Sequence, residues 1–104
     1  MSDSVTFKEN HTQGWRLMAA NREAGLFGSV GFSWISSGSA YRYNHHIKEV
    51  TVRLRVENPE GDARTLHEGV AGKARTKAEA VKVARAYVRE HGLRQQLRAA
   101  VAPA

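Results

Sequence analysis

The stretch Glu49–Glu57, with the sequence EVTVRLRVE, decides the fold of this chain. Side chains in a β-strand point alternately to the two faces of a sheet. Aliphatic and polar residues alternate here, which predicts a strand with one buried face and one face in water. Arg53 and Arg55 fall on the wet face. The aliphatic positions are Val50, Val52, Leu54 and Val56.

The residues that follow predict a hairpin. Asn58–Gly61 reads NPEG, with Asn first, Pro second and Gly fourth, which is typical of a type I turn. We therefore expect a returning strand from Arg64 to Glu68, with Leu66 facing the core.

A helix is predicted next. Thr76–Glu79 is a capping box, in which the Thr hydroxyl and the Glu carboxylate each satisfy a free N–H. The helix should run from Lys77 to about Glu90 and stop at His91-Gly92, and a short second helix can follow. The apolar stripe that packs on the sheet is Ala80, Val83, Ala84, Tyr87 and Val88.

Two strands are predicted upstream. Residues 15–19 alternate with a period of two, and Leu26–Ile35 places Val30, Phe32 and Trp34 on one face. Glycines in this second strand indicate a bulge or a close backbone approach. Residues 36–39 form a polar connector, and residues 1–10 are expected to be a disordered tail.

These elements predict an α+β fold, with a three- or four-stranded antiparallel sheet and one C-terminal helix packed on one face. A chain of 104 residues supports a single domain, which we place at residues 11–104. The absence of cysteine excludes disulfides and thiolate chemistry. With no signal-peptide pattern and no long apolar run, we expect a cytoplasmic protein without a membrane partner.

The positive charge is concentrated in the second half of the chain. The net charge is +6, of which residues 61–104 contribute +5. Such a distribution favours an acidic partner, and nucleic acid is the partner we expect.

The first candidate site is the wet face of the strand at residues 49–57. If Tyr41 and Tyr43 belong to the same strand, they share the face of Arg53 and Arg55 and could stack on bases. Alternatively, a bulge near residues 44–48 turns both tyrosines into the core.

The second candidate site is the basic run at the start of the predicted helix, where free N–H groups favour a phosphate. A solvated helix face is the alternative. The residues of this run are Lys73, Arg75, Lys77, Lys82, Arg85 and Arg89. The histidines lack the spacing of a metal site, and no nucleophile elbow or carboxylate pair is present, so no enzyme activity, metal or cofactor is expected.

The order of motifs resembles a known family. A basic alternating strand, an Asn-Pro-Glu-Gly turn, a return strand and Thr-Lys-Ala-Glu-Ala at residues 76–80 follow one another. Over Val50–Val88 this order resembles the arm-type DNA-binding domain of phage and transposon integrases. In that family the sheet enters the major groove, which implies that Arg53, Arg55 and Arg64 contact DNA. Residues 72–80 are also similar to the end of a double-stranded RNA-binding domain.

The sequence therefore predicts a small basic protein that binds nucleic acid, DNA rather than RNA, through an open sheet face. The alternative is a protein-interaction module, such as a phage or mobile-element accessory protein that binds a host protein. Exposed aromatic side chains at Trp15, Phe27 or Trp34 would favour that alternative.

Overall fold

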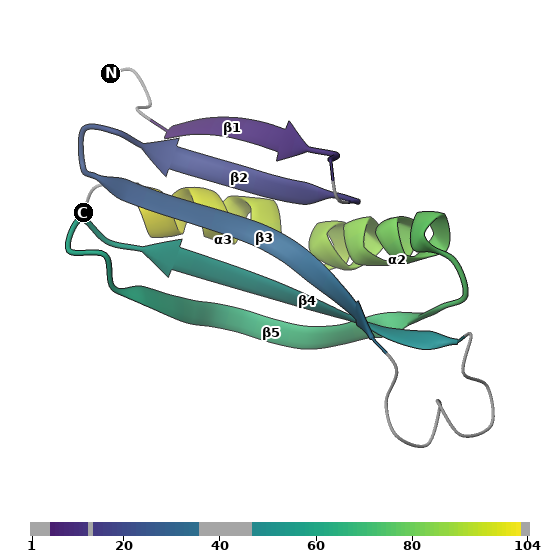
Figure 1. The fold of residues 1–104 in the computed structure, drawn as a ribbon. Helices are drawn as coiled ribbons and strands as arrows, with labels where there is room; N and C mark the ends of the chain where they lie inside the picture. The colour runs from purple at the N-terminus through teal and green to yellow at the C-terminus, as the bar shows by residue number, and fades with distance from the viewer. Residues whose placement is uncertain (1–4, 13, 36–46, 103–104) are drawn as a thin grey trace.

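The computed structural model describes residues 5–12, 14–35 and 47–102. In these residues the chain forms an antiparallel sheet of five strands and then two helices, an α+β fold (Figure 1). The strands are β1 (Val5–Asn10), β2 (Arg16–Asn21), β3 (Leu26–Ile35), β4 (Lys48–Glu57) and β5 (Ala63–Ala74). The helices are α2 (Lys77–Glu90) and α3 (Leu93–Val101).

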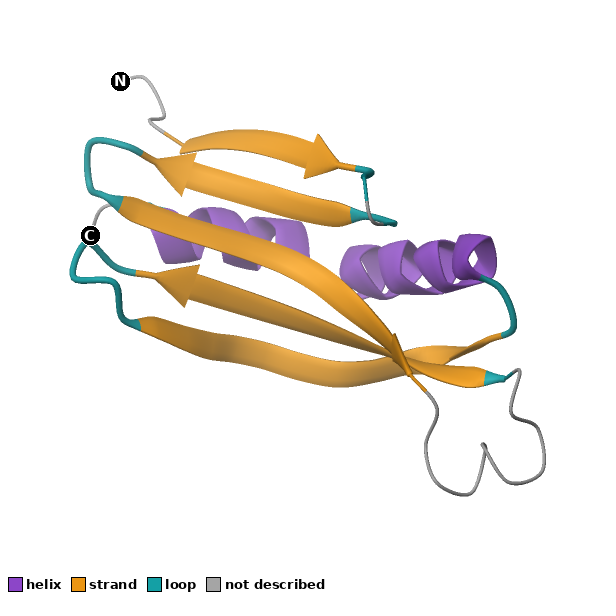
Figure 2. Ribbon diagram, viewed as in Figure 1, coloured by secondary structure: helices purple, strands orange, loops and turns teal. Residues whose placement is uncertain are grey.

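The sheet is a simple meander, in which each strand pairs with the next along the chain. The central strand is therefore β3. Both helices lie behind one face of the sheet, and the other face carries no helix of the described chain (Figure 2). This arrangement separates a packing face from an open face.

The first strand corrects the prediction of a disordered tail for residues 5–10, whereas residues 1–4 lie outside the described residues. Val5–Asn10 pairs with β2 along its whole length, and Val5 is buried. The ring of Phe7 lies under the guanidinium groups of Arg94 and Arg98, at 4.5 and 4.8 Å from the ring centroid. This additional strand makes the sheet larger than the three or four strands predicted.

The core lies between the sheet and the helices. Val50, Val52 and Leu54 are fully buried, as the alternation in β4 predicts. The helix side of the core consists of Ala80, Ala84, Val88, Leu93, Leu97 and Val101. A Cβ atom at Gly28 would lie only 2.6 Å from Cδ1 of Leu97, so this glycine allows α3 to pack closely on β3.

A register shift between β4 and β5 overturns the prediction for Leu66. Leu54 pairs with His67 and Arg55 pairs with Thr65, which leaves Leu66 as the extra residue of a bulge. Its side chain is 43% exposed rather than buried. His67 takes the inward position instead and hydrogen-bonds Oη of Tyr87 at 2.7 Å.

The helix limits agree with the sequence. Helix α2 covers Lys77–Glu90, and Oγ1 of Thr76 accepts a hydrogen bond from the Glu79 amide at 3.2 Å. Gly92 has a φ of 61°, the left-handed conformation that ends α2 and precedes α3. Neither described helix is long and apolar enough to cross a membrane.

Replacing Thr76 with Ala is expected to lower the free energy of unfolding by about 0.5–2 kcal/mol, because the Glu79 amide loses its acceptor. Denaturant melts of the variant and the parent protein measure this difference. Thr76→Ser keeps the hydroxyl and serves as the control. An unchanged midpoint in the alanine variant would show that this cap contributes nothing.

Candidate nucleic-acid interface

Small side chains run along the open face of the central strand β3. Ser29, Gly31 and Ser33 occupy successive positions on this face. Arg55, Arg53 and Thr51 of β4 pair with them in that order. Short residues at the centre of the sheet, next to long ones on its neighbours, leave a depression along β3.

Two hollows, of about 300 and 420 Å³, occupy this depression. Arg16, Ser29 and Arg55 line both of them, so the hollows are adjacent. Arg53, Ser33 and Thr51 line only the smaller hollow. The floor is thus formed by small and hydroxyl side chains, and the walls carry arginines from β2 and β4.

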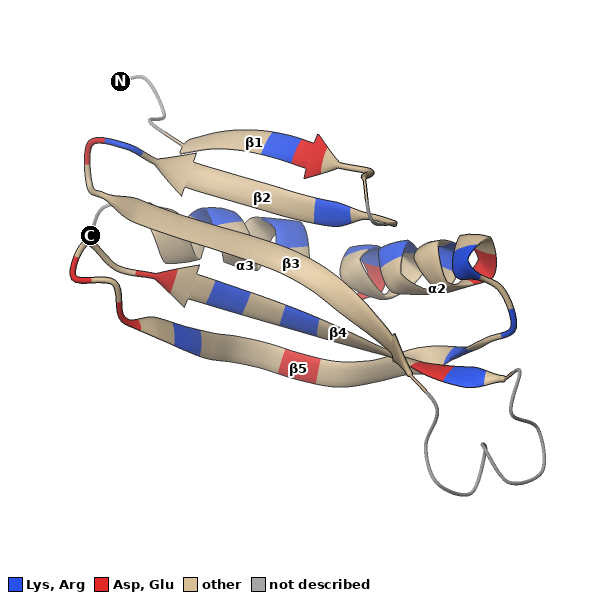
Figure 3. Ribbon diagram, viewed as in Figure 1, with Lys and Arg blue, Asp and Glu red and all other residues tan. Residues whose placement is uncertain are grey.

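The three arginines of the hollows differ in their pairing. Nε of Arg53 forms an ion pair with the Glu68 carboxylate on β5. In the described part of the chain, no ion pair involves Arg16 or Arg55. Figure 3 shows the basic positions of β2 and β4 on either side of β3. Arg16 and Arg55 therefore offer guanidinium donors to an anion.

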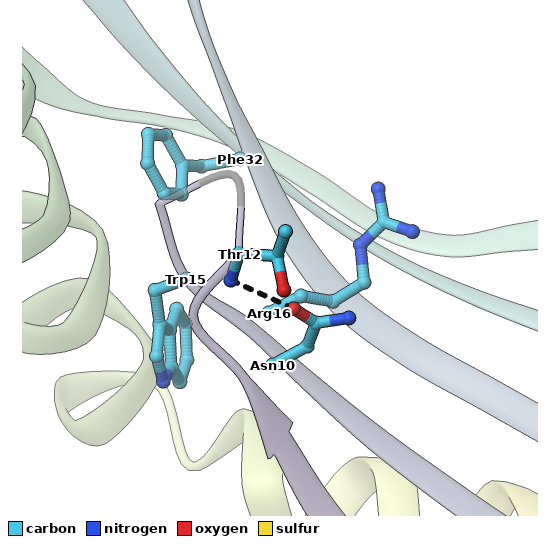
Figure 4. A pocket seen from close by; sticks show the side chains of 5 residues that line it. All are labelled: Asn10, Thr12, Trp15, Arg16 and Phe32. Carbon is cyan, nitrogen blue, oxygen red and sulfur yellow. Dashed lines mark hydrogen bonds between the residues drawn. The ribbon is translucent and has the colours of Figure 1, made fainter.

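Arg16 reaches the depression because of local geometry. Its side chain extends away from that of Trp15, as expected for consecutive residues in an extended segment, and also away from the Phe32 ring (Figure 4). The guanidinium crosses above Gly31, where a Cβ atom would lie 3.3 Å from Nε of Arg16. The missing side chain of Gly31 thus gives Arg16 its position over the sheet.

Phe27 and Met18 form an apolar end to the larger hollow. Their side chains are 49% and 39% exposed. Glu57 also lines this end and pairs with Phe27 across the strands. The larger hollow therefore combines an aromatic ring with two arginines and one carboxylate.

The predicted site residues divide between several places. Arg53 and Arg55 lie together on the open face, as the alternation predicts. Arg64 pairs with the buried Val56, so its side chain leaves the sheet on the other face. The integrase resemblance groups Arg64 with Arg53 and Arg55, whereas the register separates it from them.

The basic run also divides. Lys73 pairs with Glu49 at the far end of the sheet. Arg75 and Lys77 flank the start of α2, where both side chains are exposed. Tyr41 and Tyr43 lie outside the described residues, so both positions suggested for them stay predictions.

Part of the helix charge contributes to packing. The guanidinium of Arg85 lies 5.8 Å from the Trp15 ring centroid and 4.0 Å from the Glu9 carboxylate. Nε1 of Trp15 donates a hydrogen bond to Glu9 at 3.2 Å. This hydrogen bond, more than the nearby Arg85 charge, lowers the pKa of Glu9.

The aromatic residues that would favour a protein partner are mostly enclosed. Trp15 is buried, and Nε1 of Trp34 donates to the carbonyl of Ala74 at 3.0 Å. Trp34 is partly buried against the core. Of these two and Phe27, only Phe27 is an exposed side chain.

Sequence reasoning missed Arg16 as a site residue and considered Phe27 only as an anchor for a protein partner. The alternation with a period of two places both side chains on the face of the sheet opposite to the core residues. This pattern could have identified them as residues of the open face. Their convergence with Arg55 depends on the pairing of β2, β3 and β4. Comparisons with known protein families, curated proteins and solved structures gave no match for this chain.

Proposed function

We propose that this protein is a non-enzymatic nucleic-acid-binding protein that binds DNA through the open face of its sheet. The observation that carries the proposal is the position of Arg16 and Arg55. They stand on the walls of a hollow with a floor of small residues, and neither forms an ion pair within the described chain. A guanidinium group in this setting can donate two parallel hydrogen bonds to a phosphate.

The surroundings of the two arginines suit a phosphodiester backbone. The hydroxyl groups of Ser29, Ser33 and Thr51 line the smaller hollow and can donate to phosphate oxygens. The net charge of +6 adds a favourable long-range attraction. The preference for DNA over RNA is supported by the resemblance of Val50–Val88 to the arm-type domain of integrases.

Salt dependence tests this proposal. Affinity for a fluorescein-labelled random-sequence duplex should fall steeply with salt, with a log–log slope near −0.9 for each phosphate contact. Engagement of Arg16, Arg53 and Arg55 therefore predicts a slope of about −2 to −3. Fluorescence anisotropy at a series of salt concentrations measures it. Undetectable binding at low salt, both to this duplex and to a single-stranded DNA of the same length, would overturn the proposal.

A protein-interaction module is the second candidate, for instance an accessory protein of a phage or mobile element that binds a host protein. Exposed apolar side chains on the sheet favour it, since such residues anchor protein interfaces. These residues are Met18, Phe27, Ile35, Leu66 and Val70. Failure of DNA binding at low salt would leave this candidate in front.

A further inference from the structure

The exposed ring of Phe27 is the starting observation. It lies on the open face of β3, where its partners across the sheet are Ala20 and Glu57. About half of the side chain, 49%, remains in contact with solvent. An aromatic ring on an open sheet face is a surface on which a planar group can stack.

The ring belongs to the same hollow as the arginines. Phe27, Met18, Arg16 and Arg55 all line the hollow of about 420 Å³. A ligand that fills this hollow therefore meets two cations and one aromatic face, with the single Glu57 carboxylate beside the ring. A nucleotide offers a phosphate to the cations and a base to the ring, so the charges and surfaces are complementary.

The width of the sheet argues against insertion into a duplex groove. Five strands at a spacing of about 4.8 Å extend roughly 19 Å from β1 to β5. The major groove of B-DNA is only about 12 Å wide. The hollow lies over the central strands, so β1 and β5 would meet the duplex backbones before the hollow reached the bases.

A paired base offers no free face to Phe27, because its neighbours in the duplex stack on it. An unpaired base can rotate out and stack on an aromatic side chain. We propose that the open face binds single-stranded DNA, with backbone phosphates on Arg16 and Arg55 and a base on Phe27. This inference rests on the proposed DNA binding and specifies the form of DNA that is bound.

The test compares a fluorescein-labelled oligothymidine with a hairpin duplex that carries the same number of phosphates. We expect the 104-residue chain to bind the oligothymidine at least about fivefold more tightly than the duplex, since stacking of one base on an aromatic ring contributes at least about 1 kcal/mol. Phe27→Ala should remove that advantage and leave the salt slope unchanged. Phe27→Trp should retain it, and Arg55→Ala should reduce the slope for oligothymidine by about 0.7.

Ile35→Ala provides the matched control. Ile35 is an exposed apolar residue on the same face of β3, but it does not line either hollow. Its replacement should change the affinity for neither oligothymidine nor duplex, and thermal melts should show that all three alanine variants fold.

Two results would separate this inference from the proposed function. The single-strand inference is overturned if the duplex binds as tightly as the oligothymidine. It is also overturned if Phe27→Ala leaves the affinity for oligothymidine unchanged. In that case, salt-dependent duplex binding that is weakened by Arg55→Ala would leave the proposed function standing. Absence of binding to either probe at low salt overturns both.

Discussion

Replacing both Arg16 and Arg55 with Ala is expected to weaken DNA binding by at least about 100-fold at low salt. Hydrogen bonds to charged groups contribute about 1.5–3 kcal/mol each, and every 1.4 kcal/mol is a factor of ten in affinity. The two residues line both hollows and make no ion pair among the described residues. Their replacement therefore leaves no carboxylate without its ion-pair partner. Fluorescence anisotropy titrations measure the change.

The matched control removes two charges from the helix side of the molecule. Lys82 and Arg89 are exposed residues of α2, on the other side of the sheet from the hollows. We prefer Arg89 to Arg85 because Arg85 packs over Trp15. Lys82→Ala with Arg89→Ala should weaken binding far less than the change on the open face.

Two outcomes would contradict this assignment. The opposite ranking would move the binding site to α2. Equal and small losses in both double variants would indicate general attraction by the net positive charge, with no dedicated site. Melting curves recorded first would exclude unfolding as the cause of either loss.

The part of the fold that could be predicted is the part governed by local pattern. The alternation in Glu49–Glu57 places Arg53 and Arg55 on the face opposite Val52 and Leu54, and the structure confirms this. The cap at Thr76 is equally local, because it needs only a hydroxyl three residues before a free amide.

The errors arose where distant segments decide the local structure. Residues 5–10 end in polar residues and look like a tail, but they form a strand by pairing with β2 and packing Phe7 under Arg94 and Arg98. The alternation along residues 64–68 predicts that the Leu66 side chain faces the core, but a bulge in β5 turns it toward solvent. Neither the pairing nor the bulge is encoded in a short window of sequence.

The candidate site depends both on local sequence pattern and on the pairing of distant segments. Each arginine could be assigned to a face from its own strand, but the hollow requires the register that brings Arg16 over Gly31 and Arg55 beside Ser29. A meander fixes that register through its turns and its core contacts. The sequence therefore predicted a basic open face, but the depression in it could be found only from the assembled sheet.

The second large effect concerns stability. Leu97 is fully buried, and its Cδ1 atom occupies the space left by the absent side chain of Gly28. Leu97→Ala is expected to lower the free energy of unfolding by about 2–5 kcal/mol, because it leaves a cavity where α3 packs on β3. Denaturant melts measure it, with the exposed Gln95→Ala of the same helix as the control.

The Leu97 variant also tests the separation of the two faces. Leu97 packs behind the sheet, whereas Arg55 and Phe27 lie on its open face. Well below its unfolding midpoint, Leu97→Ala should therefore retain the DNA affinity of the parent protein. A loss of affinity in the folded variant would show that α3 controls the shape of the hollow through β3. A stability change as small as that of Gln95→Ala would show that α3 is not anchored at Gly28.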